Sequence, residues 1–97
     1  MKAIFISYNQ ALTDRVHKIL DDCGVRGFTK WALTEGRGSN DGEPHYGTHA
    51  WPSMNASILA IVDDAQVAPV LDALRAMDAA TSQQGSRAFV WNIEQTM

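Results

Sequence analysis

The residues best suited to chemistry in this chain of 97 residues lie in one glycine-rich segment, residues 36–53. His45 and His49 are four residues apart there, with Asp41 and Glu43 just before them. Imidazole and carboxylate groups bind zinc and copper ions. A copper or zinc site is therefore one hypothesis for this pair; the spacing supports it only if the segment becomes helical, and the site would need a third ligand, for example from another subunit. The alternative is a pair of solvated loop histidines.

A second group suited to chemistry is a pair of arginines that lie beside glycines. Arg37 stands between Gly36 and Gly38, and Arg87 follows Gly85 and Ser86. Guanidinium groups bind anions through paired hydrogen bonds, and glycine-rich backbone can line an anion site with its N–H groups. The two arginines are therefore candidates for holding an anionic effector; otherwise they are solvated charges.

Catalytic motifs are not found in the sequence. It has no HExxH motif, no Walker motif and no Ser/His/Asp order with a nucleophile elbow. Cys23, the single cysteine, is interpreted as a small core residue at a helix end. The pairs Asp21–Asp22 and Asp63–Asp64 are explained by solvation and helix capping. We therefore do not expect an enzyme.

The overall composition favours one globular cytoplasmic domain over residues 1–97. The net charge is −3 and the 8 basic residues form no stripe, which argues against nucleic-acid binding. A single cysteine cannot form a disulfide within the chain, as is typical of a reducing compartment. The start of the chain reads as a strand rather than a signal peptide, and no apolar run is long enough to insert into a membrane.

The elements that must position these residues follow from hydrophobic periodicity. Alternation and β-branched content predict strands over residues 1–8, 27–35, 54–62 and 87–93. Helical spacing predicts a helix over residues 11–23, capped by Asn9, and a second helix that begins at Asp63–Asp64 and carries an apolar stripe from Val67 to Met77. In the second strand, strict alternation places Trp31 and Thr34 on opposite faces.

The order of these elements is two strand–helix–strand units, which predicts an α+β ferredoxin-like fold, βαββαβ. Its antiparallel four-stranded sheet would carry both helices on one face. The strands are nevertheless apolar on both faces, for example Phe5 against Ile4 and Ile6. Because a free face should alternate apolar with polar residues, we expect other subunits to bury it. The sequence therefore predicts an oligomer.

Several segments together resemble the PII signalling proteins. They are "GVRGFTKWALTEGRG", "SILAIVDDAQVAPVLDAL", "TSQQGSRAFVW" and, within the long loop, "EPHYG". The resemblance covers nearly the whole chain through the order and spacing of these segments. It implies a homotrimer in which the three sheets face the centre, with effector sites for adenine nucleotides (ADP, ATP or AMP) in the clefts between subunits. It also implies that residues 36–53 form a flexible signalling loop that docks on a target protein.

Site residues are carried over from this resemblance by position. Thr29 matches a family threonine near the adenine, and Val62, Asp63 and Asp64 match the strand end that faces the base. Gly36, Arg37 and Gly38 match the loop base that wraps the nucleotide, and Gly85, Ser86 and Arg87 match the loop that holds phosphates. Tyr46 and Trp51 are the aromatic candidates for contacting a partner protein, although Trp51 could instead pack back on the trimer.

The sequence also departs from the family pattern. The loop before Arg87 is shorter than the family's phosphate loop, the family's basic C-terminal segment has no counterpart after Met97, and Trp51 stands where well-known members carry a modifiable tyrosine. The resemblance is therefore to a divergent branch, of the kind linked with metal-ion and bicarbonate transporters. A metal-binding sensor for metal efflux, which would use His45 and His49, and a purely structural trimer are the alternatives.

Overall fold

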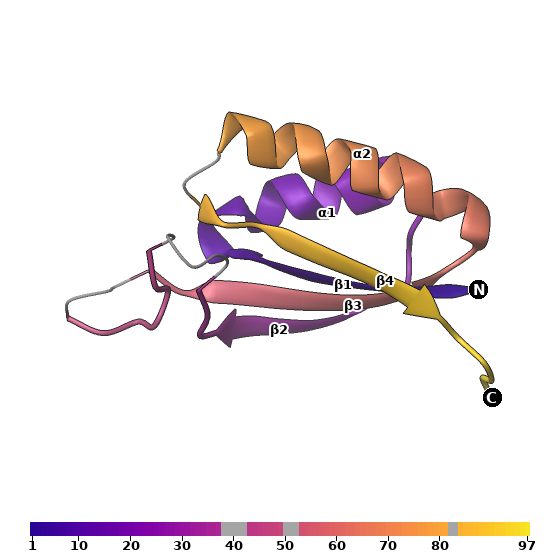
Figure 1. Ribbon diagram of the computed structural model, residues 1–97, viewed down its shortest axis with the longest axis horizontal. Helices are drawn as coiled ribbons and strands as arrows, with labels where there is room; N and C mark the ends of the chain where they lie inside the picture. Colours follow the sequence, from indigo (N-terminus) through magenta and orange to yellow (C-terminus); the bar gives the residue numbers. More distant parts are fainter. Residues whose placement is uncertain (38–42, 50–52, 82–83) are drawn as a thin grey trace.

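The computed structural model describes residues 1–37, 43–49, 53–81 and 84–97, and shows the predicted ferredoxin-like order of elements (Figure 1). The elements are β1 (Lys2–Asn9), a 3-10 turn η1 (Gln10–Leu12), α1 (Thr13–Asp22), β2 (Thr29–Thr34), β3 (Asn55–Val62), α2 (Asp64–Ala80) and β4 (Arg87–Asn92). The strands form one antiparallel sheet in the order β2-β3-β1-β4. Both helices lie on the same face of this sheet, as predicted.

The first predicted helix is in fact a 3-10 turn followed by α1. Asn9 caps this unit as expected, because its side-chain oxygen accepts a hydrogen bond from the backbone N–H of Ala11 at 2.9 Å. The second predicted helix also begins where the acidic pair indicated. Asp63 is the N-cap of α2, and its backbone N–H donates to the side-chain oxygen of Gln66 at 2.9 Å.

The core lies between the sheet and the helices. Even-numbered residues of β1 and β3 point toward the helices, because side chains alternate along a strand. The core includes Ile4, Ile6, Tyr8, Ile58, Val62, Val16, Leu20, Val70, Leu74 and Met77, all buried. These strands therefore hold the sheet rigidly against both helices and fix where its two ends lie.

Strand β2 departs from the predicted alternation. Trp31 pairs with Ser57 and Thr34 pairs with Asn55, so the register shifts by one residue between them. Such a bulge places both residues on the same face, and the hydroxyl groups of Thr34 and Ser57 lie 3.1 Å apart. The prediction of opposite faces for Trp31 and Thr34 was therefore wrong, because simple alternation does not anticipate an extra residue.

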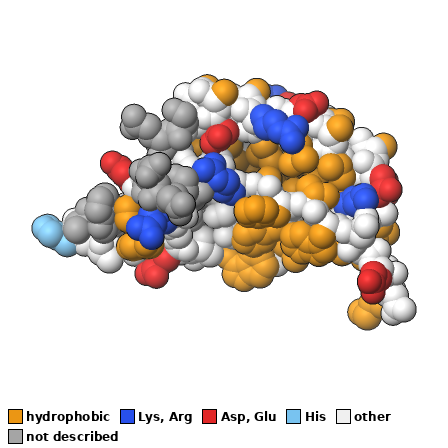
Figure 2. Space-filling model, viewed as in Figure 1, with side chains coloured by type: hydrophobic (Ala, Val, Ile, Leu, Met, Phe, Trp, Pro, Cys, Tyr) orange, Lys and Arg blue, Asp and Glu red, His pale blue; other side chains and the backbone are white. Residues whose placement is uncertain are grey.

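The face of the sheet away from the helices, here called the open face, is rich in exposed apolar side chains. Its most exposed members are Phe89 (58% exposed), Trp31 and Trp91 (47% each) and Ile61 (44%). Figure 2 shows hydrophobic side chains gathered on the underside of the molecule, beneath the sheet. A contiguous apolar surface of this kind is typical of a face that contacts another protein.

Candidate functional site

Arg37 and Arg87, 50 residues apart in the sequence, line the same hollow at one end of the open face. The hollow has a volume of about 270 Å³. Its lining residues are Phe5, Ser7, Gly36, Arg37, Asn55, Arg87 and Phe89. The lining residues thus include two arginines, a serine and an asparagine beside two phenylalanines, which is a composition suited to an anion with a flat apolar part.

The sheet register explains why these residues meet. Ser7, near the end of β1, pairs with Ser57 on β3 and with Arg87 at the start of β4. The end of β2 reaches the same level, because Thr34 pairs with Asn55. This end of the sheet, with the chain from Thr34 to Arg37, His45, Asn55 and Arg87, is called the loop end below.

A buried polar pair, His45 and Asn55, adjoins the hollow, and Asn55 is one of its lining residues. His45 is 3% exposed and Asn55 is 4% exposed. The imidazole Nδ1 of His45 lies 2.6 Å from the Oδ1 of Asn55, and the Nδ2 of Asn55 donates to the hydroxyl of Ser7 at 3.4 Å. Because Oδ1 can only accept, Nδ1 of His45 carries the hydrogen. Each of the two buried side chains therefore has a hydrogen-bond partner, as buried polar groups require.

The backbone closes the base of the long loop at the same place. Gly36 and His45 exchange two backbone hydrogen bonds, of 3.0 Å and 2.6 Å between nitrogen and oxygen. Tyr46 forms a further bridge with Met54. A Cβ atom on Gly36 would lie 2.8 Å from the Nδ2 of Asn55. Only glycine therefore leaves room for the Asn55 side chain to lie against the loop base.

The segment just before β4 contains Gly85 and the buried Ser86. Gly85 adopts a φ of +69°, a left-handed conformation that favours glycine. Ser86 is buried, and its hydroxyl has no hydrogen-bond partner in the part of the chain that the structure describes. Arg87 donates from Nη1 to the carbonyl of Ser86 at 2.7 Å. Ser86 and Arg87 also line a smaller hollow, of about 140 Å³, between β4 and α2.

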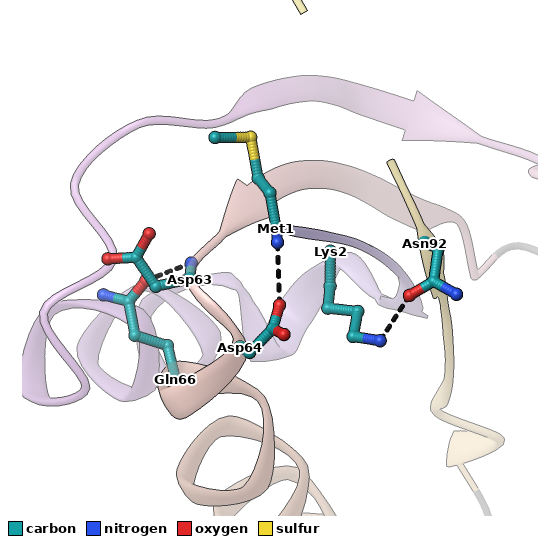
Figure 3. Close-up of polar contacts among 6 residues, drawn as sticks. All are labelled: Met1, Lys2, Asp63, Asp64, Gln66 and Asn92. Atoms are coloured by element: carbon teal, nitrogen blue, oxygen red, sulfur yellow. Dashed lines mark hydrogen bonds and ion pairs between the residues drawn. The ribbon is translucent and has the colours of Figure 1, made fainter. Parts of the chain in front are cut away.

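The opposite end of the sheet, here called the acidic end, holds Val62, Asp63 and Asp64. The carboxylate of Asp64 accepts a hydrogen bond of 2.8 Å from the terminal ammonium group of Met1 (Figure 3). This hydrogen bond, and then the charge of the ammonium group, lower the pKa of Asp64. Beside them the amine of Lys2 donates to the side-chain oxygen of Asn92. Apart from Val62, the groups here are mainly solvated.

The predicted effector residues therefore fall into two sets that one chain keeps apart. Gly36, Arg37 and Arg87 meet at the loop end, whereas Val62, Asp63 and Asp64 lie at the acidic end. Thr29, at the start of β2, pairs with Leu59 and is exposed. At about 3.3 Å per residue, the 8 residues of β3 separate the two ends by roughly 20 Å or more. Gly38 and Trp51 lie outside the described residues.

Two solvated loop histidines would have similar surroundings, but His45 and His49 do not. His49 is exposed, but His45 is buried against Asn55, so its interpretation as a solvated loop residue was wrong. Among the described residues, no group of three or more His, Cys, Asp or Glu side chains is placed to hold a metal ion. The copper or zinc hypothesis thus gains no support from this part of the chain.

Sequence reasoning missed Ser7 and Asn55 as residues of the hollow. Both are small polar residues at the loop end of strands that are otherwise apolar. Their odd numbers place them on the open face together with Phe5 and Ser57. Two paired strands therefore carry polar residues at the same end of one face. This pattern in the sequence could have indicated a polar site there.

The fold and the hollow define a ferredoxin-like domain with a basic, partly apolar site at the loop end of its sheet. The model of the family described as nitrogen regulatory protein P-II matches residues 1–97. The chain belongs to this P-II family of signalling proteins, as the resemblance implied. No curated protein matches the chain. No helix in the described part of the chain is long and apolar enough to cross a membrane.

Solved structures of PII-like proteins share the fold. CPII from Thiomonas intermedia K12, described as a nitrogen regulatory PII-like protein bound to ADP, AMP and bicarbonate, has a TM-score of 0.77 and 24% identity, over 95% of this chain and 84% of CPII. The apo form of CPII has a TM-score of 0.73 and 22% identity, with coverage of 95% and 87%. A putative PII-like signalling protein from Thermus thermophilus has a TM-score of 0.66 and 21% identity, with coverage of 95% and 85%.

Proposed function

We propose that this protein is a trimeric PII-like regulator that binds an adenine nucleotide, ADP first among them, in clefts between its subunits. The observation that carries this proposal is the convergence of Arg37 and Arg87 on one hollow of the open face. The complexes of CPII with ADP, AMP and bicarbonate support the same ligand chemistry for a chain of this family.

The division of the candidate residues between two ends supports a site shared by two chains. The loop end would supply the guanidinium groups for phosphates, and the acidic end of a neighbouring chain would face the base. Association through the open face would bring unlike surfaces together, and a head-to-tail contact of this kind closes into a ring. The exposed Trp31, Ile61 and Trp91 side chains supply the apolar surface for that contact.

The long loop connects the site to a second protein in this proposal. Gly36 and Arg37 belong both to the loop base and to the lining of the hollow. A ligand that contacts them would bind one loop state better than another and so shift the population between states. Tyr46 and Trp51 are the proposed contacts for the regulated protein, and a membrane transporter is the class of partner that we propose.

Isothermal titration calorimetry of the metal-free protein with ADP tests the proposal. We expect saturable binding at about one site per chain. Arg37→Ala combined with Arg87→Ala should weaken binding about a hundredfold, since each charge-assisted hydrogen bond contributes roughly 1.5 kcal/mol. Arg26→Ala, which removes an exposed arginine outside the hollow, is the matched control.

Titrations with ATP, AMP and bicarbonate then show which anions the site accepts. ATP and AMP in the same titration report on the number of phosphates that the two arginines accommodate, and bicarbonate added with ADP reports on a second anion. Binding of ADP that is unchanged in the double variant would contradict the assignment of the hollow. The absence of any heat with ADP at millimolar concentration would overturn the proposed function.

A further inference from the structure

Asn55 occupies the boundary between the hollow and the loop. It is the first residue of β3, directly after the long loop, and it lines the hollow together with Arg37 and Arg87. Its side chain is buried, although it belongs to the open face. A carboxamide held in that position contacts both regions through its two ends.

The two ends of the Asn55 carboxamide make unequal contacts. The oxygen accepts a short hydrogen bond of 2.6 Å from His45. The nitrogen carries two hydrogens, yet within the described residues its hydrogen bond is a long one, of 3.4 Å, to the hydroxyl of Ser7. The second hydrogen of this nitrogen has no acceptor among the described residues, and the two residues beside the nitrogen, Ser7 and Gly36, both line the hollow. An anion held in the hollow by the two arginines would offer that acceptor.

His45 connects the Asn55 side chain to the base of the loop. Its side chain is held by Asn55, and its backbone is held by Gly36 through two hydrogen bonds. Gly36 in turn lies against the Asn55 amide, where a single added carbon would be 2.8 Å away. These three residues form one closed cluster, so a shift of the carboxamide must move the loop base or break the bond to His45.

We propose that Asn55 is the positioning residue that couples the hollow to the loop: its amide nitrogen binds an oxygen of the bound anion, and its amide oxygen holds the loop through His45. This inference rests on the proposed function, since the anion is the nucleotide phosphate or bicarbonate of that site. A carboxamide is planar, so an anion that draws the nitrogen also moves the oxygen. The coupling must also act in reverse, because linkage between two sites is reciprocal.

Two variants separate the two halves of this coupling. His45→Ala removes the loop contact but leaves the amide nitrogen of Asn55 in place. Asn55→Asp keeps an acceptor for His45 but replaces the N–H donor by a negative oxygen that repels an anion. His49→Ala is the matched control, because His49 lies in the same loop, is exposed and does not line the hollow.

The measurement is backbone amide hydrogen exchange at Gly36 and His45, with affinity by calorimetry, for ADP and bicarbonate added separately and together. In the wild type we expect the ligand that reaches Asn55 to change exchange at these two amides. In His45→Ala both amides should exchange faster without ligand, the ligand should no longer alter them, and affinity should fall roughly tenfold, the size of one net hydrogen bond. In Asn55→Asp exchange without ligand should resemble the wild type, whereas affinity should fall at least about tenfold.

Several outcomes would overturn the coupling. One is a wild type that binds ADP, while neither ADP nor ADP with bicarbonate changes exchange at Gly36 and His45. Another is Asn55→Asp with wild-type affinity; in either case the proposed function stands while the coupling falls. A wild type that does not bind ADP overturns the proposed function, and the coupling with it. Slow exchange at Ile4 and Ile58 in the core checks that each variant is folded. If His45→Ala does not fold, the affinity of Asn55→Asp alone tests the coupling.

Discussion

The two ends of the sheet are built in opposite ways. At the loop end, His45 and Asn55 are buried and joined by a short hydrogen bond, and two arginines flank them. At the acidic end, Asp64 and the terminal ammonium group are paired but largely exposed. Removing the partner of a buried polar group lowers the stability of the fold considerably, because that group is left without a hydrogen bond. An exposed ion pair contributes little to stability. The loop end is therefore expected to be sensitive to substitution, and the acidic end tolerant.

The largest effect is expected from separating the chains, since the two ends can form one site only across a subunit contact. Ile61→Lys places a charge on the open face close to the acidic end, where Ile61 is 44% exposed and pairs with Ala3. We expect light scattering to show a monomer in place of a trimer, and calorimetry to show ADP affinity lower by about a hundredfold or more, because the contacts from one end are lost.

Ala79→Lys is the control for that variant, because Ala79 is exposed on α2, away from the open face. It should keep both the mass and the affinity of the wild type. A monomeric Ile61→Lys protein that binds ADP with full affinity would contradict a site shared by two chains, because one end of the sheet would then be enough to bind the nucleotide.

An intermediate effect is expected at Gly36 within the loop end. Gly36→Ala brings a carbon to 2.8 Å from the Asn55 amide, which must shift and weaken its bond to His45. We expect the free energy of unfolding to fall by about 1 kcal/mol and ADP affinity to fall several-fold. Chemical denaturation and calorimetry measure the two.

Gly27→Ala provides the comparison for Gly36→Ala, because nothing lies within 4 Å of a Cβ atom at Gly27. It should leave ADP affinity unchanged. Equal losses of affinity in the two glycine variants would show that the close approach of Asn55 has no special role.

The smallest effect is expected at the acidic end from Asp64→Asn. The terminal ammonium group lowers the pKa of Asp64, so the ion pair favours the folded state above the ordinary pKa of 3.8. That contribution declines as the pH falls through the lowered value. Melting temperatures of the wild type and Asp64→Asn should therefore differ slightly at pH 7 and low salt, and converge at acid pH or high salt. A large difference that persists in high salt would contradict the exposed nature of this pair.

Much of the fold could be predicted from the sequence, because the core stripes have clear periods. Val16 and Leu20 on α1, and Ile4 and Ile6 on β1, are buried as their spacing required. The acidic N-cap Asp63 was also predictable from residue type alone. These features depend on local chemistry, which a single sequence carries.

The bulge in β2 and the burial of His45 could not be predicted in the same way. Nearly every residue of β2 is exposed, so no apolar alternation marks where the extra residue lies. His45 is buried by Asn55 and by the backbone of Gly36, which meet it only in the folded chain. In a loop rich in polar residues, no pattern distinguishes a histidine that is buried against Asn55 from one that faces water. The placement of Arg37 beside Arg87 came from the family resemblance rather than from the residues themselves.

The reciprocal backbone pair between Gly36 and His45 has a consequence for how such a protein could change its partner. The pair joins the two ends of the segment from Arg37 to Pro44, and lengthening a closed segment adds a closure entropy of only about 0.6 kcal/mol for each doubling. Insertions or exchanged sequences between Arg37 and His45 would thus leave the hollow and its supporting hydrogen bonds intact. If the proposed function holds, a different recognition sequence placed between these two hydrogen-bonded ends would direct the regulator to another target protein.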